Sequence, residues 1–415
     1  MADRPVAVVG GGPAGLAAAI ELRRRTGREV VVVEREAEAG GIPRHARHQG
    51  FGLRDLRRPL SGPAYARRYA ELARAAGAEL LTETMVTGWS GEGPGALELT
   101  GPGARSTLEP AAVVLASGCR ERPRPARLVP GSRPDGVMTT GMLQQLVYLQ
   151  GLPAGGRALV VGAEHVSFSA ILTLAHGGAR TVALATELPR HQSLAAFRLG
   201  ALARHRVPVW TSTRVTDIRG RPRVEEVDLT DTVTGGVRTV ACDTVVFSAD
   251  WIPDHELAVA AGLELDPATH GPAVDAALRS SRHGVFAAGN LLHGAEQADV
   301  AALGGRHAAA GVAAYLDRGE WAVRRVPVVC DPPLGWIAPN AVSDPAEVPA
   351  RGRFALRASE FLSAPRIEIA QGGRRLWSGR VARVMPGRSA RLPHGWTREV
   401  DPAGDEVRVT ARGAG

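Results

Sequence analysis

The 415-residue chain contains no lysine, so arginine supplies all 50 of its basic residues. No side chain can therefore form a lysine Schiff base, and that branch of covalent catalysis is excluded. A formal net charge of +8 would suit a nucleic-acid partner. However, no long basic run and no basic segment interleaved with aromatic residues is present, and abundant Arg, Ala, Gly and Pro indicate the codon bias of a GC-rich genome. We expect no nucleic acid as the main partner.

Cysteine is also scarce, and long apolar runs are missing. Cys119, Cys242 and Cys330 lie far apart and make no C-x-x-C, zinc or iron–sulfur pattern. We expect no metal site and no dithiol relay. No apolar run approaches the roughly 20 residues of a membrane-spanning helix, and the N-terminus lacks a signal-peptide pattern. These absences predict a cytoplasmic protein without a membrane span.

A glycine-rich turn near the N-terminus carries the clearest signal of the sequence. An apolar run at 6–9 leads into G-x-G-x-x-G, and an alanine-rich helical pattern follows directly; the turn comprises Gly10, Gly12, Pro13, Ala14 and Gly15. In a strand–turn–helix of this kind the glycines allow the tight turn, the approach of a pyrophosphate and close helix packing. The helix start offers free N–H groups to the phosphates. We predict a dinucleotide site here.

Residues after the next apolar run extend this prediction. Glu34 ends the run at 30–33 and stands where a carboxylate holds a ribose. Arg35 follows it, and Gly40 and Gly41 are placed to cross the pyrophosphate. His48, in a glycine-rich polar loop, has two interpretations: a group close to the reactive end of the cofactor, or a surface histidine.

Later segments supply the rest of the first site. An apolar run at 111–116 ends in Ala116, Ser117 and Gly118, which suggests a crossover to another domain. A late strand closes on Gly289 and Asn290, and an alanine-rich helix at about 298–316 follows it. This order predicts that the chain returns to its first domain.

A second Rossmann-like unit begins near residue 157. We expect a strand at 158–161, a turn at 162–167, a helix at 168–176 and a strand at 181–185, then strands near 207–218, 224–230 and 244–248. Glu164 replaces the second glycine, and its charge would repel a pyrophosphate. Binding of NADH or NADPH here is left open; the candidate residues are Gly162, Glu164, His165 and Ser167.

After Gly319 the pattern changes to period-two alternation, which predicts a small antiparallel β domain. Trp336, Trp377 and Trp396 suit either an interface or simple packing on the rest of the chain. The expected fold is α/β, with two Rossmann-like dinucleotide-binding domains, the second inserted in the first, and a small C-terminal β domain. Its domains are 1–121 with 265–318 for FAD, 122–264 as the NAD(P)-binding-like domain, and 319–415.

Together these motifs resemble the flavoproteins with two dinucleotide-binding domains, the glutathione-reductase-like class. A closer similarity is to FAD subunits grouped with anaerobic glycerol-3-phosphate, opine, sarcosine and cyanide-forming glycine dehydrogenases. It covers about residues 5–318 and lies in segments 40–41, 48–53, 62–66, 83–86, 117–122 and 130–137. Ala46 stands where such relatives often have a cysteine, so a thiol beside the flavin is not expected there. For Cys119, a thiol near the cofactor and a structural small residue are both considered.

The resemblance implies FAD as the cofactor and NAD(P)H as a further candidate. In this class the first motif holds FAD, Val86 would meet the adenine side, and Asn290, in place of an aspartate, the ribityl or pyrophosphate region. It also implies a FAD-dependent oxidoreductase that works as one part of a small-molecule dehydrogenase, beside a second flavoprotein and an iron–sulfur subunit. The sequence indicates no catalytic acid, base or nucleophile. A stand-alone NAD(P)H-dependent enzyme and a flavin-carrying scaffold without turnover are the alternatives.

Overall fold

The computed structural model describes residues 4–193, 199–200, 204–294, 296–322 and 324–412. The chain forms two compact units. The first contains Met1–Arg44, Gln49–Cys119 and Pro253–Gly415, and the second contains His45–His48 and Arg120–Ile252. Two short strands at the boundary, β10 (Cys119–Glu121) and β19 (Trp251–Pro253), pair with each other.

A five-stranded parallel sheet is the centre of the first unit. Its strands run in the order β20-β9-β1-β2-β5, with β1 (Val6–Val9), β2 (Val30–Val33), β5 (Glu79–Leu81), β9 (Ala112–Leu115) and β20 (Val285–Ala287). Every residue of β1, β2 and β9 is buried. Continuous valine-rich runs are typical of strands covered on both faces, so period-two alternation is absent here.

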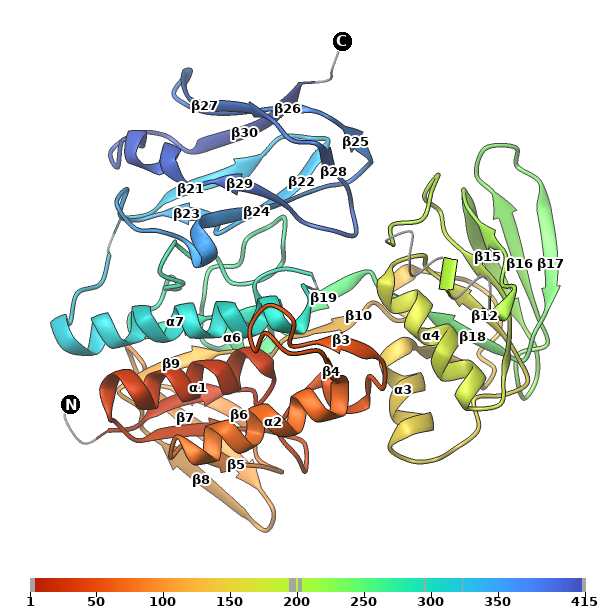
Figure 1. Cartoon of the computed structure of the whole chain (residues 1–415), viewed down its shortest axis with the longest axis horizontal. Helices are drawn as coiled ribbons and strands as arrows, with labels where there is room; N and C mark the ends of the chain where they lie inside the picture. Colours follow the sequence, from red (N-terminus) through yellow and green to blue (C-terminus); the bar gives the residue numbers. More distant parts are fainter. Residues whose placement is uncertain (1–3, 194–198, 201–203, 295, 323, 413–415) are drawn as a thin grey trace. The chain divides into compact units, whose positions relative to one another are not determined.

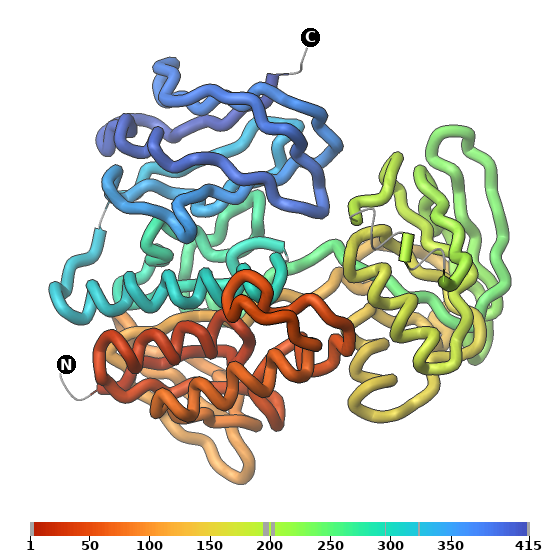
Figure 2. The backbone as a smooth tube through the Cα atoms, in the orientation of Figure 1, coloured from red at the N-terminus to blue at the C-terminus, as the bar shows by residue number. Residues whose placement is uncertain are grey.

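Helices α1 (Pro13–Thr26) and α7 (Ala298–Arg318) are far apart in the sequence of the first unit and lie side by side (Figures 1 and 2). Small residues permit this contact. A Cβ on Gly305 would lie 1.9 Å from the carbonyl oxygen of Ala14, so only glycine fits there. Because α1 starts at the glycine-rich turn, the packing also fixes where that turn lies against α7.

Shorter elements complete this part of the first unit. Helix α2 (Gly62–Ala75) packs by Tyr65 and Tyr69, whose hydroxyls both donate to the buried carboxylate of Asp55, at 2.5 and 2.7 Å. Burial raises the pKa of both phenols, so they stay protonated and keep donating. The remaining strands are β3 (Gln49–Phe51), β4 (Leu60–Ser61) and the antiparallel sheet β6 (Met85–Ser90), β7 (Ala96–Gly101) and β8 (Ala104–Leu108).

The C-terminal part of the first unit is a β domain with its own apolar core. One sheet has the order β23-β21-β30-β26-β27 and another the order β22-β24-β29. The strands are β21 (Val326–Cys330), β22 (Leu334–Ala338), β23 (Ala341–Val342), β24 (Arg353–Ala358), β25 (Leu362–Ser363), β26 (Arg366–Gln371), β27 (Arg374–Arg380), β28 (Arg383–Val384), β29 (Ala390–Pro393) and β30 (Val407–Arg412). The expectation of a purely antiparallel domain is corrected at one place, because β21 pairs with β30 in parallel. Trp396 packs on Phe354 in the core, so this tryptophan is not an exposed interface residue.

The second unit is built on a five-stranded parallel sheet of order β11-β18-β12-β13-β14. Its elements are β11 (Val137–Thr139), α3 (Thr140–Tyr148), β12 (Arg157–Val161), α4 (His165–His176), β13 (Arg180–Ala185), β14 (Val209–Trp210) and β18 (Thr244–Phe247). An antiparallel sheet of β15 (Thr213–Arg219), β16 (Glu226–Asp231) and β17 (Val237–Ala241) follows β14. The strand expected at 207–218 is split, because Ser212 has a φ of 48° between β14 and β15.

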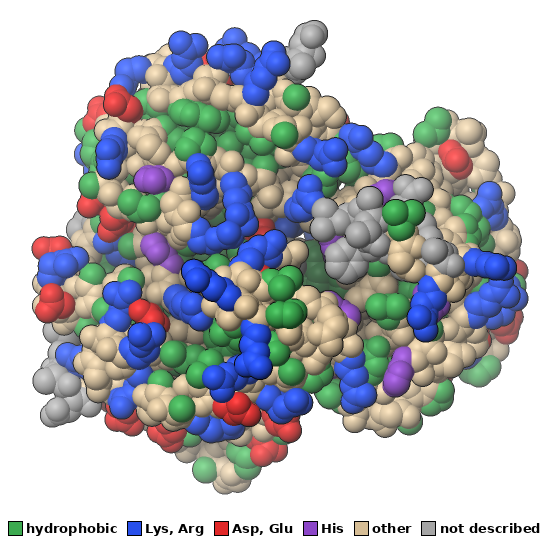
Figure 3. Space-filling view, in the orientation of Figure 1, with side chains coloured by type: hydrophobic (Ala, Val, Ile, Leu, Met, Phe, Trp, Pro, Cys, Tyr) green, Lys and Arg blue, Asp and Glu red, His purple; other side chains and the backbone are tan. Residues whose placement is uncertain are grey.

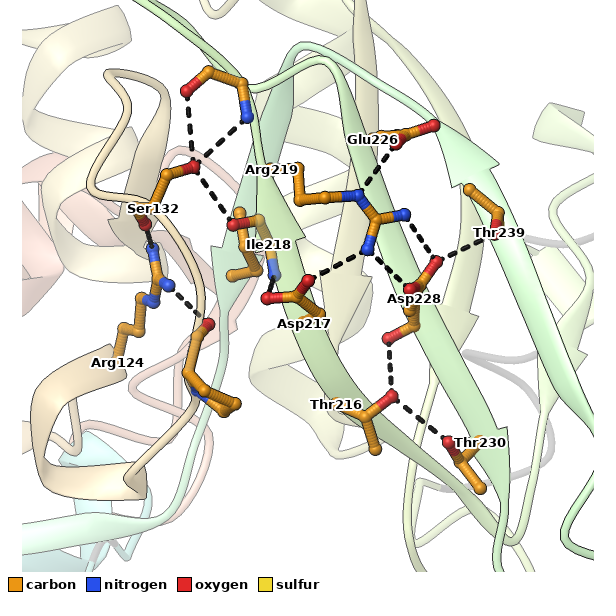
Figure 4. Close-up of polar contacts among 12 residues, drawn as sticks. Arg124, Ser132, Thr216, Asp217, Ile218, Arg219, Glu226, Asp228, Thr230 and Thr239 are labelled. Atoms are coloured by element: carbon orange, nitrogen blue, oxygen red, sulfur yellow. Dashed lines mark hydrogen bonds and ion pairs between the residues drawn. The ribbon is translucent and has the colours of Figure 1, made fainter.

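A surface ion-pair network spans β15 and β16 (Figure 4). The Arg219 guanidinium bonds to Asp217, Glu226 and Asp228. This arginine and a hydrogen bond from Thr239 lower the pKa of Asp228 to about 2. Exposed pairs of this kind add little stability. These ion pairs favour the observed register of β15 and β16, since Arg219 lies directly opposite Glu226 on the neighbouring strand.

Candidate functional site

The glycine-rich turn of the first unit joins the end of β1 to the start of α1. Gly10 has a φ of 108°, and a Cβ there would lie 2.4 Å from the carbonyl oxygen of Ala116 on the neighbouring strand. Gly15 is equally constrained, because its Cβ would lie 1.9 Å from the Gly10 carbonyl oxygen. Both glycines are therefore required by the fold itself, and neither has side-chain space for anything else.

Gly12 differs from these two. It is the N-cap of α1, no side chain caps the helix, and its backbone is in an ordinary extended conformation. A Cβ on Gly12 would meet only the Cα of Gly41, at 4.0 Å. The space beside the helix start is therefore open, and the first-turn N–H groups and helix dipole favour an anion there. Pro13, at the first helical position, removes one donor that would otherwise need a partner.

Glu34, at the end of β2, is buried beside this turn. One carboxylate oxygen accepts a hydrogen bond from the Gly11 N–H at 2.8 Å, and the other accepts one from the Glu36 N–H at 2.9 Å. These bonds hold the carboxylate in one orientation. A carboxylate has about four acceptor positions, so capacity for two ribose hydroxyls is left.

The loop after Glu34 returns to the glycine turn. The Gly40 N–H donates to the Gly11 carbonyl at 2.7 Å, and a Cβ on Gly41 would lie 2.9 Å from the Gly12 Cα. The structure thus brings together these two glycines and the open start of α1. Arg35 lies on the surface with Asp254 at 3.8 Å and Glu36 at 3.9 Å.

Ala116, Ser117 and Gly118 follow β9 at the same end of the sheet. Ala14, Ala116 and Ala301 form a small buried apolar cluster between α1, β9 and α7. The Ser117 hydroxyl donates to the Asp254 carbonyl at 2.8 Å, and the Asp254 N–H donates to the Gly118 carbonyl at 2.9 Å. The segment at 116–118 is thereby tied to the chain where it re-enters the first unit. No motif in the sequence marks Asp254.

Gly289 and Asn290 come directly after β20, in the short helix η3 (Gly289–Leu291). A Cβ on Gly289 would lie 2.6 Å from the Cβ of Ala14, so this segment also reaches the start of α1. The Asn290 amide closes the following loop: its oxygen accepts from the Glu296 N–H at 2.9 Å and its nitrogen donates to the Glu296 carbonyl at 3.2 Å. One amide N–H is left for another acceptor.

Val86 and His48 are the remaining residues predicted for the first site. Val86 is buried in β6, where it pairs with Leu99. His48 belongs to the second unit, with its backbone N–H bonded to the Ala46 carbonyl. Their roles toward the cofactor stay predictions.

The second glycine turn, in the second unit, is organised differently. Gly162 has a φ of 133°, and a Cβ there would lie 2.8 Å from the Ser167 hydroxyl. Glu164 is the N-cap of α4, and its side chain accepts from the N–H of the third helical residue, while the Ser167 hydroxyl accepts from the Glu164 N–H. This capping box starts α4 at His165, three residues before the expected 168. A carboxylate of the chain itself therefore occupies the anion position at this helix start.

None of the three cysteines, all of them in the described part of the chain, forms a disulfide. Burial raises the pKa of the Cys242 thiol to about 11 and that of the Cys330 thiol further, which disfavours the nucleophilic thiolate. Among the residues that the structure describes, no group of three His, Cys, Asp or Glu side chains could hold a metal ion, and no helix is long and apolar enough to cross a membrane.

A pocket lies next to Asn290, and no sequence motif predicted it. It lies between the start of α7 and the β22-β24-β29 sheet, is open to solvent on one side, and has a volume of about 120 Å³. His293, at its edge, stacks on Trp336 at 4.5 Å, and burial lowers the pKa of this histidine to about 4. Arginines of the β domain line the other side. No local motif marks them, because they come from distant segments.

This arrangement is that of a protein with two dinucleotide-binding folds, one with an open helix start and one with a capped start. The chain belongs to the pyridine nucleotide-disulphide oxidoreductase family, whose model matches residues 4–305. It is therefore an oxidoreductase and a flavoprotein, with FAD as its cofactor and NAD(P)H as the nucleotide of the family. The open space at Gly12 and the oriented carboxylate of Glu34 fit FAD.

Comparisons with known proteins agree with this family. The chain is 29% identical over 357 residues to one of the subunits of opine oxidase from Rhizobium meliloti, covering 77% of this chain and 64% of that protein. It is 28% identical over 340 residues to hydrogen cyanide synthase subunit HcnB of Pseudomonas aeruginosa, covering 74% and 70%. The match thus spans less than two thirds of the opine oxidase protein's own length. Both relatives are named as subunits, which agrees with the resemblance seen in the sequence.

Solved structures share the fold. Thioredoxin reductase of T. acidophilum matches with a TM-score of 0.61 and 21% identity, over 76% of this chain and 99% of that one. A NAD-dependent persulfide reductase of A. fulgidus matches with a TM-score of 0.58 and 20% identity, over 91% of this chain and 70% of that one. These matches bear out the predicted α/β fold class with two dinucleotide-binding domains.

Proposed function

We propose that this chain holds FAD without a covalent bond and passes hydride or electrons as one subunit of a dehydrogenase for a small molecule. The substrate class that we propose from the resemblance seen in the sequence is an amine, an amino acid or a glycerol-3-phosphate-like compound. The observation that carries the proposal is the open, uncapped start of α1 at Gly12, with the Glu34 carboxylate fixed beside it.

Each residue of the first site has a role in this proposal. The start of α1 and Gly12 would bind the pyrophosphate, Glu34 would bind the adenosine ribose, and Asn290 would donate its remaining amide N–H to the ribityl or pyrophosphate region. FAD supplies the redox chemistry once it is bound. The protein contributes binding, orientation and the exclusion of water at the buried ends of β1 and β9.

We propose that the chain works with partners because its own residues offer no dithiol relay and because its relatives are named as subunits. The three cysteines form no disulfide with one another, and a dithiol relay needs two thiols that can pair. The relatives from opine oxidase and hydrogen cyanide synthase carry subunit names. The partners we therefore propose are a second flavoprotein and an iron–sulfur subunit. The location we propose is the cytoplasm.

Two alternatives predict different behaviour. A stand-alone NAD(P)H-dependent enzyme needs a working second site, which the Glu164 cap opposes. A flavin-carrying scaffold without turnover is favoured by the same cap. No other feature of the described residues favours either alternative.

The test compares the purified chain, with its flavin content measured, alone and mixed with the products of its gene neighbours. Amines, hydroxy acids, amino acids and glycerol 3-phosphate are supplied with an artificial electron acceptor. We expect turnover only on mixing. Robust turnover by the chain alone would contradict the proposed need for partners. Bleaching by NADH or NADPH without any other turnover would favour the stand-alone enzyme, and retained flavin with no reduction in any mixture would favour the scaffold.

A further inference from the structure

One face of the β22-β24-β29 sheet carries several arginines beside its apolar residues. Along β24, Phe354 and Leu356 are buried in the core of the β domain, while Arg353 and Arg357 alternate with them and point the other way. Arg391 on β29 lies opposite Ala355 and so shares the face of Arg353. Figure 3 shows basic side chains gathered on this side of the β domain. A sheet face turned away from its own core presents these charges to α7 and the loop before it.

Three of the arginines on this side are unpaired. In the part of the chain that the structure describes, no carboxylate forms an ion pair with Arg351, Arg353 or Arg391, and all three line the pocket. Partial burial, and then the neighbouring charges of Arg391 and Arg54, lower the pKa of Arg351, while the charges of Asp299 and Glu296 act in the opposite direction. Like charges held close together are unfavourable, and an anion between them would relieve the repulsion.

Two carboxylates lie nearby, each within 4 Å of an arginine other than these three, although the Glu296 oxygen so placed accepts no hydrogen bond among the described residues. Glu296, on the pocket wall, lies 3.9 Å from the buried guanidinium of Arg357. Asp299 pairs with Arg54 at 3.1 Å. The pocket therefore keeps an excess of positive charge in spite of these two acidic side chains.

The opposite wall is largely apolar. It is formed by side chains at the end of the first unit's sheet and at the start of α7, namely Leu278, Leu292, Val300 and Ala301. Asn290 lies at the same wall. Because burial keeps His293 neutral near pH 7, this histidine adds no charge to the pocket.

We propose that this pocket, the arginine pocket (Arg351, Arg353 and Arg391 facing Asn290 and Val300), binds a small organic acid. Its carboxylate or phosphate group would be held by the arginines, since the guanidinium fork matches both groups. Its carbon skeleton would lie on the apolar wall. The proposal deepens the proposed function and rests on it, since it names an organic anion as the substrate class beside the segment assigned to FAD.

Calorimetry on the FAD-loaded protein tests the arginine pocket without measuring turnover. The probes are benzoate, phenyl phosphate, their neutral analogue benzyl alcohol, and inorganic phosphate. We expect benzoate or phenyl phosphate to bind with one site per chain, benzyl alcohol not to bind, and inorganic phosphate to bind more weakly than phenyl phosphate. The tighter of the two acids identifies the favoured head group. Binding should weaken as salt is raised, because the arginines are exposed.

Two double variants separate the pocket from general charge. Arg351→Ala with Arg391→Ala should weaken binding of the organic anion at least about tenfold, as expected for the loss of charge-assisted hydrogen bonds. Arg375→Ala with Arg383→Ala removes the same charge from exposed positions of the same domain outside the pocket and should leave binding unchanged. Thermal unfolding and the flavin spectrum of each variant show whether the fold and FAD are retained.

Equal weakening by both double variants, equal binding of inorganic and phenyl phosphate, or no binding of either organic acid would overturn the assignment. The FAD content of the same samples keeps the two proposals distinct. Protein with full FAD that binds no organic acid refutes only the arginine pocket. Protein without FAD that still binds the acid through Arg351 and Arg391 refutes the flavin site instead.

Discussion

Glu164 offers the sharpest test of how the second unit treats a nicotinamide dinucleotide. Its carboxylate caps α4 at the position where the first unit leaves its helix start open. Glu164→Gln keeps an oxygen that can accept the capping hydrogen bond and removes the charge. We expect this variant to bind NADH or NADPH more tightly, since like-charge repulsion near a phosphate is worth on the order of 1 kcal/mol at a partly exposed site, roughly a fivefold change in affinity.

Neither Glu164 substitution should destabilise the fold enough to obscure the change in nucleotide affinity. Losing the charge at the helix start removes about 0.3–1 kcal/mol of favourable interaction with the helix dipole. Glu164→Gly loses the cap as well, although glycine itself is tolerated at this position for a few tenths of a kcal/mol. We therefore expect both variants to fold and glycine, which also clears the side chain, to give the larger gain in affinity.

Calorimetry gives the affinities, and anaerobic mixing with NADH or NADPH shows whether bound nucleotide reduces the flavin. Glu225→Gln, an exposed acid of the same unit, is the matched control and should change nothing. Tight binding of the nucleotide by the unaltered protein would refute the blocking argument and support the stand-alone enzyme. No gain from either Glu164 variant would show that something other than this carboxylate limits the site.

Two further changes test the first unit. Gly12→Val should fold, because its Cβ has open space, yet purify without FAD because the side chain fills the pyrophosphate position; full flavin content, read from the visible spectrum, would refute that position. Asp55→Ala leaves two buried phenol hydroxyls without their acceptor and should lower the free energy of unfolding in urea by about 3 kcal/mol, with Asp55→Asn less severe. A loss below about 1 kcal/mol for the alanine variant would mean that Tyr65 and Tyr69 find other partners.

The first site could be predicted from the sequence because its signals are local. A valine run, three glycines and a helix start within ten residues fix a strand–turn–helix, and the structure shows why Gly10 and Gly15 cannot be replaced. The return of Gly289 to the start of α1 was also predictable, since a buried strand followed by glycine predicts a tight turn at the carboxyl end of a parallel sheet, where the glycine-rich turn also lies. The domain limits and the roles of the individual site residues stay predictions.

Long-range features could not be predicted in this way. The alternation around Arg353 indicates a strand with one polar face, but not which element lies opposite that face. The arginine pocket needs residues near 290, 351 and 391 together, and only the packed fold supplies that. At Glu164 the sequence indicates the charge but not the cap, because Glu at the N-cap with Ser three residues later reverses the usual order of a capping box.

The two glycine turns of this chain have the same strand–turn–helix fold but differ in one side chain at the helix start. We propose that this side chain decides which turn binds a dinucleotide. Both follow a buried parallel strand and both open a helix. At Gly12 the helix dipole and free N–H groups have no side-chain cap, so a phosphate gains their full interaction. At Glu164 the protein's own carboxylate already makes that interaction, so a phosphate must displace a charge and a hydrogen bond before it binds. On this argument we propose that FAD binding is built into the first unit, and that electrons reach the flavin from a substrate or partner more readily than from a nucleotide in the second.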